Sequence, residues 1–192
     1  METEDWYPAP DKIYASNLAL ETTAQLQQTD IFPSVKEAVP ATGKEGFAIE
    51  NKVKLTFHPD FANEAGLLKE KLASIHGLEV VSKAPVTVHL DYLPERETAV
   101  NGEYYRIDTG NGLINISAST SHGIFNGTQT LLSLLKGQEK PFHLEALSIR
   151  DYPDLPYRGQ MLDIARNFTT VEHLKKLVDV ISSYKLNVLH FH

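Results

Sequence analysis

A proline-rich segment, Arg150–Pro156, divides the chain into two parts with different hydrophobic patterns. Its sequence, RDYPDLP, places prolines at positions 153 and 156. Proline fixes its own φ angle, removes a backbone donor and moves the preceding residue away from helical geometry. A continuous helix or central strand therefore cannot cross this segment. We expect an extended connection between a part that ends near residue 150 and a part that begins at residue 151.

The first part, residues 31–150, alternates between strand and helix patterns. Val53, Leu55 and Phe57 recur at every second position, which is typical of a half-buried strand. Gly110-Asn111-Gly112 separates two short alternating runs and indicates a hairpin. We expect strands over 46–57, 86–90, 104–108, 113–118 and 144–149, and helices over 62–75 and 121–136, with Gly77, Gly137 and the cap residue Ser121 at helix ends. This order predicts an α+β fold in which an amino-terminal sheet carries helices on one face.

The second part, residues 151–192, has the pattern of one βαβ unit. A buried strand is predicted over 160–165, and Leu186–His192 predicts a second strand. Between them, Thr169 and Glu172 fit a capping box, and Val171, Leu174, Val178 and Ile181 line one helix face. Such a unit requires parallel strands, which need further neighbours to cover both sheet faces. A (β/α)₈ barrel takes about 250 residues, far more than the stretch 151–192 provides. We therefore expect this part to be the first βαβ unit of a truncated barrel.

Composition excludes several classes of function. The 192 residues include no cysteine, so disulfides, thiolate nucleophiles and thiolate metal sites are excluded. The net charge is −7 and no basic run occurs, which argues against nucleic acid as a partner. No apolar stretch is long enough for a membrane span. We expect residues 1–30 to form an irregular arm, and they lack the pattern of a signal peptide. The sequence is compatible with a cytosolic protein and with a periplasmic or secreted one whose leader has been removed.

Few polar residues form a pattern that indicates a reactive site by itself. His190 and His192 point to one strand face, but a third metal ligand is not evident, and hydrogen bonding near the strand end is the favoured role. Asp163 is interpreted as a structural carboxylate paired with a neighbouring arginine such as Arg158. No Gly-x-Ser-x-Gly elbow or phosphate-binding glycine motif occurs, and no cofactor is indicated. Gly123 and Gly127 lie within a predicted helix, where they allow close packing.

Two stretches of the second part carry a family resemblance. They read YRGQMLDIARNF over residues 157–168 and YKLNVLHFH over residues 184–192. Both resemble the opening of the catalytic barrel of family 20 glycoside hydrolases, which are β-N-acetylhexosaminidases. Upstream, HGIFNGTQTLL over 122–132, Ile31-Phe-Pro33 and Gly46-Phe-Ala-Ile49 resemble the α+β domain that precedes that barrel. Asn167 departs from the pattern, because many relatives carry histidine at this position.

The resemblance implies an activity and one site residue. Family members remove terminal β-linked N-acetylglucosamine or N-acetylgalactosamine from glycans with retention, using the acetamido oxygen of the sugar as the nucleophile. Their catalytic Asp-Glu pair follows a later barrel strand, which we expect beyond His192, so this chain alone is expected to be inactive. Arg166 matches the substrate arginine that binds hydroxyls on the far side of the terminal sugar. Without the resemblance, a surface or salt-bridge arginine is the favoured interpretation of Arg166.

A second interpretation of the whole chain is a non-catalytic carbohydrate-binding or interaction module that uses the same α+β domain. The coding sequence beyond His192 distinguishes the two, because a barrel with an Asp-Glu pair supports only the enzyme. The pattern leaves the preferred sugar, the linkage and the oligomeric state open.

Overall fold

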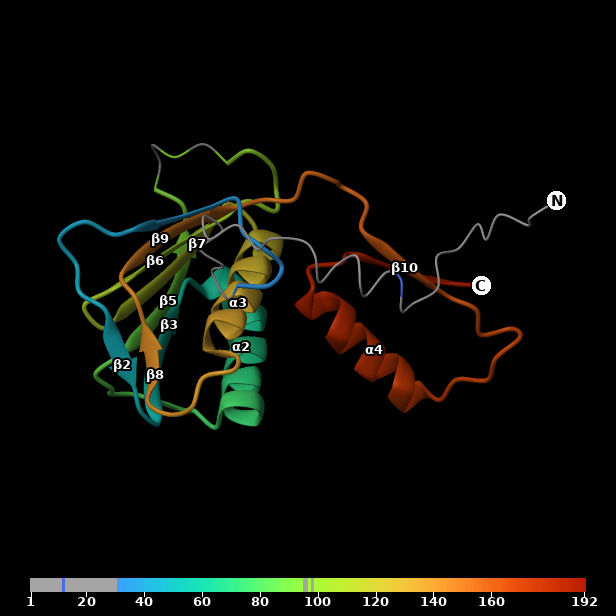
Figure 1. Cartoon of the computed structure of the whole chain (residues 1–192), viewed down its shortest axis with the longest axis horizontal. Coiled ribbons are helices and arrows are strands. Elements are labelled where there is room, and N and C mark those ends of the chain that lie inside the picture. The colour runs from blue at the N-terminus through green and yellow to red at the C-terminus, as the bar shows by residue number, and fades with distance from the viewer. Residues whose placement is uncertain (1–11, 13–30, 95–96, 98) are drawn as a thin grey trace.

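A seven-stranded mixed sheet forms the centre of the computed structural model, which describes residues 12, 31–94, 97 and 99–192 (Figure 1). The strand order is β1-β9-β6-β7-β5-β3-β4. Neighbouring strands are parallel from β4 to β7 and antiparallel from β7 to β1. The strands are β1 (Glu37–Pro40), β3 (Lys52–Phe57), β4 (Glu79–Val81), β5 (Thr87–Tyr92), β6 (Tyr105–Gly110), β7 (Leu113–Ala118) and β9 (Leu147–Asp151). The arm predicted over 1–30 lies outside the described residues, except for Lys12.

Two of the predicted strands are each divided in the structure. The expected strand over 46–57 consists of β2 (Phe47–Ile49) and β3, and the expected strand over 144–149 consists of β8 (Phe142–Leu144) and β9. β2 and β8 pair with each other in a separate antiparallel sheet. The division falls at Asn51, an exposed polar residue whose carbonyl accepts the backbone N–H of Glu79. Period-two alternation alone did not reveal this change of partner.

One face of the large sheet is apolar and buried, which explains the alternation in the sequence. Leu90, Ile107, Ile114, Ile116 and Ile149 are fully buried on it. Intervening residues such as His89, Asp108 and Asn115 are polar and partly exposed, as expected for a sheet with one face in solvent. All buried residues of the hydrophobic core lie between 31 and 149. We call residues 31–151, with the large sheet and its helices, the sheet unit.

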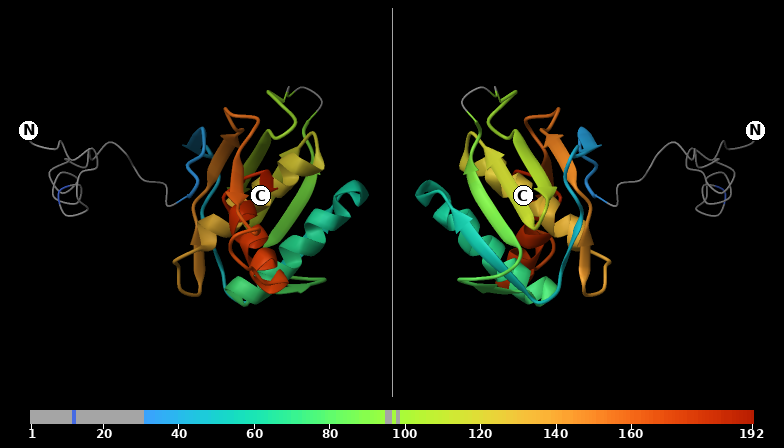
Figure 2. Two further views of the ribbon diagram at one scale, coloured as in Figure 1. Left: turned by 90° about the vertical axis from the view of Figure 1, so that its right-hand side faces the viewer. Right: turned by 90° about the vertical axis from the view of Figure 1, so that its left-hand side faces the viewer.

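Two helices cover the apolar face of the sheet. They are α2 (Ala62–His76) and α3 (Ser121–Leu135), and they lie between the sheet and a third helix, α4 (Figures 1 and 2). A short 3₁₀ turn, Pro59–Phe61, precedes α2. The predicted α+β arrangement with helices on one sheet face is therefore confirmed. α2 ends at Gly77, whose φ of 61° is a left-handed conformation that favours glycine.

The N-cap of α3 lies one residue earlier than the sequence predicts. Thr120, not Ser121, is the N-cap of α3, and its hydroxyl accepts the backbone N–H of Gly123. The expected close packing at Gly123 and Gly127 is confirmed. A Cβ atom would lie 2.4 Å from the Tyr104 carbonyl oxygen at the first position and 2.6 Å from Ile116 Cγ2 at the second.

The remaining elements form the predicted parallel βαβ unit. They are β10 (Gly159–Leu162), α4 (Val171–Ser183) and β11 (Val188–Phe191), and β10 pairs in parallel with β11. Two expectations were wrong: β10 is mostly exposed rather than buried, because β11 is its only neighbouring strand in the described residues, and Thr170 rather than Thr169 caps α4. The Thr170 hydroxyl accepts the backbone N–H of His173, so Thr169 and Glu172 do not form the expected capping box. We call residues 158–192 the βαβ unit.

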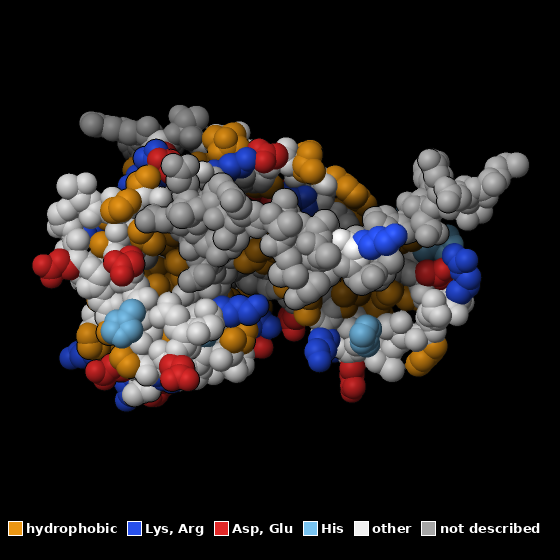
Figure 3. All heavy atoms as spheres, in the orientation of Figure 1, with side chains coloured by type: hydrophobic (Ala, Val, Ile, Leu, Met, Phe, Trp, Pro, Cys, Tyr) orange, Lys and Arg blue, Asp and Glu red, His pale blue; other side chains and the backbone are white. Residues whose placement is uncertain are grey.

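The surface shows no segregation of charge on the face drawn in Figure 3, where acidic and basic side chains are interspersed. Within the described residues, no helix has the length and apolar character needed to cross a membrane.

Candidate functional site

The carboxyl ends of β10 and β11 carry the predicted site residues. Parallel strands end at the same edge of a sheet, so the residues that follow them come together. The backbone N–H of Ile164 donates to the His192 carbonyl at 3.0 Å, and the His192 N–H donates to the Leu162 carbonyl at 3.0 Å. These bonds hold the turn over 163–166 against the end of β11. We call this turn together with His192 the strand-end site.

Arg166 projects from this turn and is held by Asp163. Arg166 Nε lies 2.6 Å from Asp163 Oδ2, and the Arg166 side chain is 80% exposed. Asp163 Oδ1 also accepts the backbone N–H groups of Ala165 and Arg166, both at 3.1 Å. The backbone bond from Arg166, then its side-chain bond and finally the backbone bond from Ala165, lower the pKa of Asp163 below its ordinary value. Asp163 is therefore an anionic clamp that fixes both the turn and one edge of the guanidinium.

This geometry leaves one face of Arg166 for a ligand. Among the described residues, no hydrogen bond reaches the two terminal guanidinium nitrogens. A planar guanidinium presents its donors as a fork, which suits two neighbouring oxygen atoms of one ligand. The arrangement is thus suited to binding a polar group with paired oxygens beyond the carboxyl ends of the strands.

The two C-terminal histidines lie near this turn without forming a metal site. His192 Nδ1 is 3.9 Å from Asp163 Oδ1, and His190 stands opposite Met161 in the parallel register. Within residues 31–94, 97 and 99–192, no group of three or more histidine, aspartate or glutamate side chains could hold a metal ion.

The prediction that Asp163 pairs with an arginine is confirmed, but the arginine named as an example was wrong. An arginine does pair with Asp163, but it is Arg166 rather than Arg158. Arg158 precedes β10, and a strand of four residues separates its two ends by about 13 Å. The Arg158 guanidinium instead forms an ion pair with Glu103 of the sheet unit.

A buried ionic cluster at the opposite ends of the same strands was not predicted. Lys185 Nζ lies 2.8 Å from Asp151 Oδ2 and 2.7 Å from the Tyr105 hydroxyl. Burial lowers the pKa of Lys185, and the Asp151 charge opposes only part of this effect. Burial also raises the pKa of Tyr105, and Asp151 adds to this increase. The three residues are 34 and more positions apart in the sequence, so no local pattern could have identified them.

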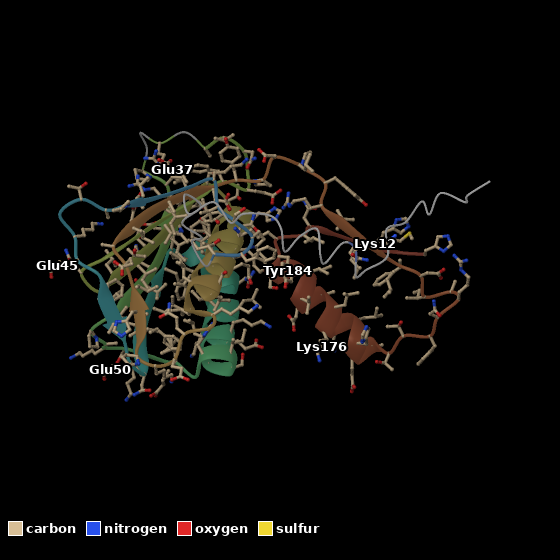
Figure 4. All side chains as sticks on the ribbon, in the orientation of Figure 1. Lys12, Glu37, Glu45, Glu50, Lys176 and Tyr184 are labelled. Atoms are coloured by element: carbon tan, nitrogen blue, oxygen red, sulfur yellow. The ribbon has the colours of Figure 1, made fainter. Side chains whose placement is uncertain are left out.

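Two hollows lie between the sheet unit and the βαβ unit. An apolar groove of about 680 Å³ runs between α2, α3 and α4 and is lined by Leu67, Ile75 and Val178 among others. Figure 4 shows Tyr184 at the end of α4 nearest the sheet unit, and Tyr184 packs edge-on against Phe32 there. A second cavity of about 370 Å³ is lined by Tyr105, Asp151 and Lys185 among others. Neither hollow includes Asp163 or Arg166.

Comparison with known families gives two adjacent matches that together cover most of the chain. Residues 28–152, nearly two thirds of the sequence, match the profile described as "Glycosyl hydrolase family 20, domain 2". Residues 155–192 match the profile described as "Glycosyl hydrolase family 20, catalytic domain". The junction between the two matches falls in the proline-rich segment.

Individual relatives give the same result. The chain is 35% identical over 97 residues to a β-hexosaminidase of Porphyromonas gingivalis, which covers 47% of the chain and 12% of that relative. It is 33% identical over 123 residues to the N,N'-diacetylchitobiase of Vibrio harveyi, which covers 62% of the chain and 14% of that relative. The aligned part is thus about one eighth to one seventh of the length of these two proteins.

Solved structures with the same fold include two bacterial enzymes. The exo-β-N-acetylglucosaminidase of Vibrio harveyi, solved with N-acetylglucosamine, superposes with a TM-score of 0.70 at 32% identity, over 85% of this chain and 25% of that one. The β-N-acetylhexosaminidase of Streptomyces coelicolor superposes with a TM-score of 0.65 at 26% identity, over 85% of this chain and 34% of that one.

Proposed function

The chain belongs to glycosyl hydrolase family 20, and on this premise we propose that it is the amino-terminal portion of a β-N-acetylhexosaminidase. The substrate class would be glycans that end in β-linked N-acetylglucosamine or N-acetylgalactosamine. The names of the relatives support this proposal, since they are hexosaminidases and a chitobiase. The observation that carries it is the continuous match of residues 155–192 to the catalytic domain, with Arg166 exposed at the strand ends.

The proposed reaction is retaining and assisted by the substrate. The acetamido carbonyl oxygen of the sugar forms a bond to the anomeric carbon while the bond to the leaving oxygen breaks. A glutamic acid donates a proton to that oxygen, and a neighbouring aspartate orients the acetamido group. Water then opens the oxazolinium ring, with the glutamate accepting its proton. We place this Asp-Glu pair beyond His192, so the 192-residue chain is expected to be inactive.

Arg166 is proposed to bind hydroxyls of the terminal sugar on the side away from the anomeric carbon. Its position supports this role, because the active sites of (β/α)₈ barrels are built at the carboxyl ends of their strands. Asp163 would keep the guanidinium in place before the sugar arrives, which reduces the entropy lost on binding.

The test is hydrolysis of an aryl N-acetyl-β-glucosaminide by the 192-residue chain and by the longer protein that we propose contains it. We expect background rates from the former and turnover from the latter. In the longer protein, Arg166→Lys keeps the charge but loses the planar fork. Because each bond to a charged group contributes about 1.5 to 3 kcal/mol, kcat/KM should fall by about ten- to several-hundred-fold.

Arg150→Lys is the matched control, since Arg150 is a half-exposed arginine in the sheet unit whose carboxylate partners are 3.8 Å and 4.0 Å away. Near-normal kinetics for Arg166→Lys would show that Arg166 is structural. Turnover by the 192-residue chain that a substitution within it abolishes would contradict the expected inactivity.

The proposal includes a division of the chain into an α+β domain over 31–150 and the opening βαβ unit of a catalytic barrel over 151–192. The confinement of the buried core to residues 31–149 supports an independent first domain. A shortened chain that ends at Asp154, which retains all of β9, should unfold cooperatively in urea. A product without a cooperative transition would show that the βαβ unit belongs to the same folding unit.

A further inference from the structure

The amino ends of β10 and β11 are attached to the sheet unit, whereas their carboxyl ends carry the strand-end site. Arg158 directly precedes β10, and Lys185 lies three residues before β11. In Figure 1 the C-terminus, which follows β11, lies on the side of the βαβ unit away from the large sheet. The two strands thus connect one set of contacts to the other through short, hydrogen-bonded segments.

Arg158 makes contacts with both units at once. Its Nη1 donates to Glu103 Oε1 at 3.2 Å, and its Nη2 forms a second, short bond to Glu103 Oε2. Its Nε donates to the Lys185 carbonyl at 2.9 Å, which links the ends of β10 and β11. The Arg158 and Glu103 side chains are only 17% and 14% exposed. This fork therefore orients both strands against the sheet unit.

Residues of α3 hold the Glu103 carboxylate in place for this contact. Asn126 Nδ2 on α3 donates to Glu103 Oε2 at 3.1 Å, and His122 Nε2 lies 3.3 Å from the same oxygen. Burial by itself raises the pKa of Glu103, but the hydrogen bonds from Arg158 and Asn126 outweigh it and the net pKa is lowered. A carboxylate is thus held in place by α3 at the point where Arg158 docks.

Lys185 supplies the second attachment point. Its ammonium group reaches Asp151 and the Tyr105 hydroxyl, and Tyr105 in turn bonds Thr130 at 2.6 Å. Asp151 Oδ1 also accepts the backbone N–H of Lys36 at 3.2 Å. Lys185 has a φ of 59°, and the chain turns there from α4 into β11. The segment that leads into β11 is thereby attached to strands β6 and β9 of the large sheet.

The ion pair that α4 forms with the sheet unit is more exposed than these contacts. No residue of α4 is buried, and its ion pair between Asp179 and Lys71 of α2 leaves Asp179 63% exposed. Exposed ion pairs contribute little to stability and orientation. Within the part of the chain that the structure describes, the Arg158 and Lys185 ion pairs are the most buried ones between the two units.

We propose that Arg158 and Lys185 are positioning residues, through which the sheet unit sets the location of Arg166 and the strand-end site. This inference rests on the proposed function of Arg166. Strands β10 and β11 transmit the placement because their ladder is short and continuous from these attachment points to the turn over 163–166. Misplacement of a binding group by about 1 Å can reduce the catalytic rate about a hundredfold. Small shifts at the attachment points would therefore weaken the contact between Arg166 and the sugar.

A double-mutant cycle in the longer enzyme tests this coupling. Arg158→Met should lower kcat/KM by about tenfold or more when Arg166 is present, and by less than about threefold in an Arg166→Ala background. The loss should appear mainly with substrates that retain the hydroxyls bound by Arg166. Equal losses in both backgrounds would show general destabilisation and overturn the proposal. Lys36→Met, which removes the ion pair with Asp154 in the same region, is the control and should change kcat/KM by less than about twofold.

Amide hydrogen exchange in the 192-residue chain gives a second test that requires no activity. In Arg158→Met, and in Lys185→Met combined with Asp151→Asn so that no unpaired charge stays buried, the amides of Ile164 and His192 should exchange about tenfold faster or more, while those of β6 and β7 keep their protection. Lys36→Met should leave both sets unchanged. If exchange at Ile164 and His192 is unaffected, the attachment points do not hold the strand ends and the proposal fails.

The two tests separate this inference from the proposed function. Absence of hexosaminidase activity in the longer protein would refute the function, whereas the exchange result would still decide the attachment. If Arg158→Met does not fold, Arg158→Lys takes its place in both tests. It keeps the charge but not the fork, so we expect a smaller change in the same direction.

Discussion

Lys185 and Asp151 form an ion pair of 2.8 Å in which the two side chains are only 11% and 9% exposed. The pair joins the βαβ unit to β9 of the large sheet, which ends at Asp151. Buried charges are costly to remove from water, so each of these two residues depends on the other. This mutual dependence gives a direct stability prediction.

Lys185→Met should destabilise the chain by about 3–5 kcal/mol, because it leaves the Asp151 carboxylate buried without its cation. The double variant Asp151→Asn with Lys185→Met should recover much of that loss, since no unpaired charge is then buried. Urea unfolding followed by circular dichroism measures both values. Additive losses in the double variant would mean that the pair contributes no coupling.

Gly127→Ala should destabilise the chain by about 1–3 kcal/mol, because the added Cβ would overlap Ile116 Cγ2 at 2.6 Å. Gly66→Ala is the matched control within α2, where nothing lies within 4 Å of the added atom. That control should stabilise the chain by about 0.5–1 kcal/mol, owing to the higher helix propensity of alanine. Thermal unfolding of both variants checks the opposite signs, and equal effects would contradict this account of packing.

Thr120→Ala should cost about 1 kcal/mol, since the Thr120 hydroxyl caps α3 by accepting the Gly123 N–H. Ser121→Ala should change stability by less than about 0.5 kcal/mol, because Ser121 is not the cap. Chemical denaturation of the two single variants distinguishes the neighbouring hydroxyls. A larger loss from Ser121→Ala would show that the cap lies one residue later.

The free energy of unfolding should fall as the pH decreases from about 5 to about 3, partly through Glu103. The pKa of Glu103 in the folded chain lies below the ordinary value of 4.5, so the unfolded chain binds a proton more readily. This contribution is fully present above the unfolded pKa and is lost as the pH falls through the folded one. The stability difference between the natural chain and Glu103→Gln should therefore narrow in acid.

The control for the acid experiment is Glu79→Gln, because Glu79 is an exposed carboxylate that forms an exposed ion pair with Lys52 at 3.5 Å. Its difference from the natural chain should stay nearly constant over the same range. A constant difference for Glu103→Gln as well would show that the Arg158 contact does not depend on the Glu103 charge.

Local patterns in the sequence were sufficient for most of the secondary structure. The hairpin at Gly110-Asn111-Gly112 and the helix that ends at Gly77 follow from backbone preferences within a few residues, and both are present. Two of the failures, both in strands, have a common cause. The division at Asn51 and the exposure of β10 depend on which strand lies alongside, which a local pattern does not specify.

The strand-end site illustrates the same distinction. Parallel pairing of two short strands was predictable, so the proximity of Asp163 to the end of β11 followed. The partner exchange between Arg158 and Arg166 was not predictable, because it depends on Glu103 in a different part of the fold. The role proposed for Arg166 in binding sugar still awaits the kinetic test.

The pairing of β1 with β9 has a consequence for synthesis of this chain on the ribosome. Glu37 stands opposite Arg150 in that ladder, so the edge strand made first can join the sheet only after β9 has been translated and released. Until then β6, the neighbour of β9, has an open edge, and Asp151 acquires its cation only when Lys185 follows. Nascent chains fold in units from the amino terminus as they appear. β1 should therefore stay protease-sensitive until β9 has left the ribosome, and become resistant in one step when the two strands pair.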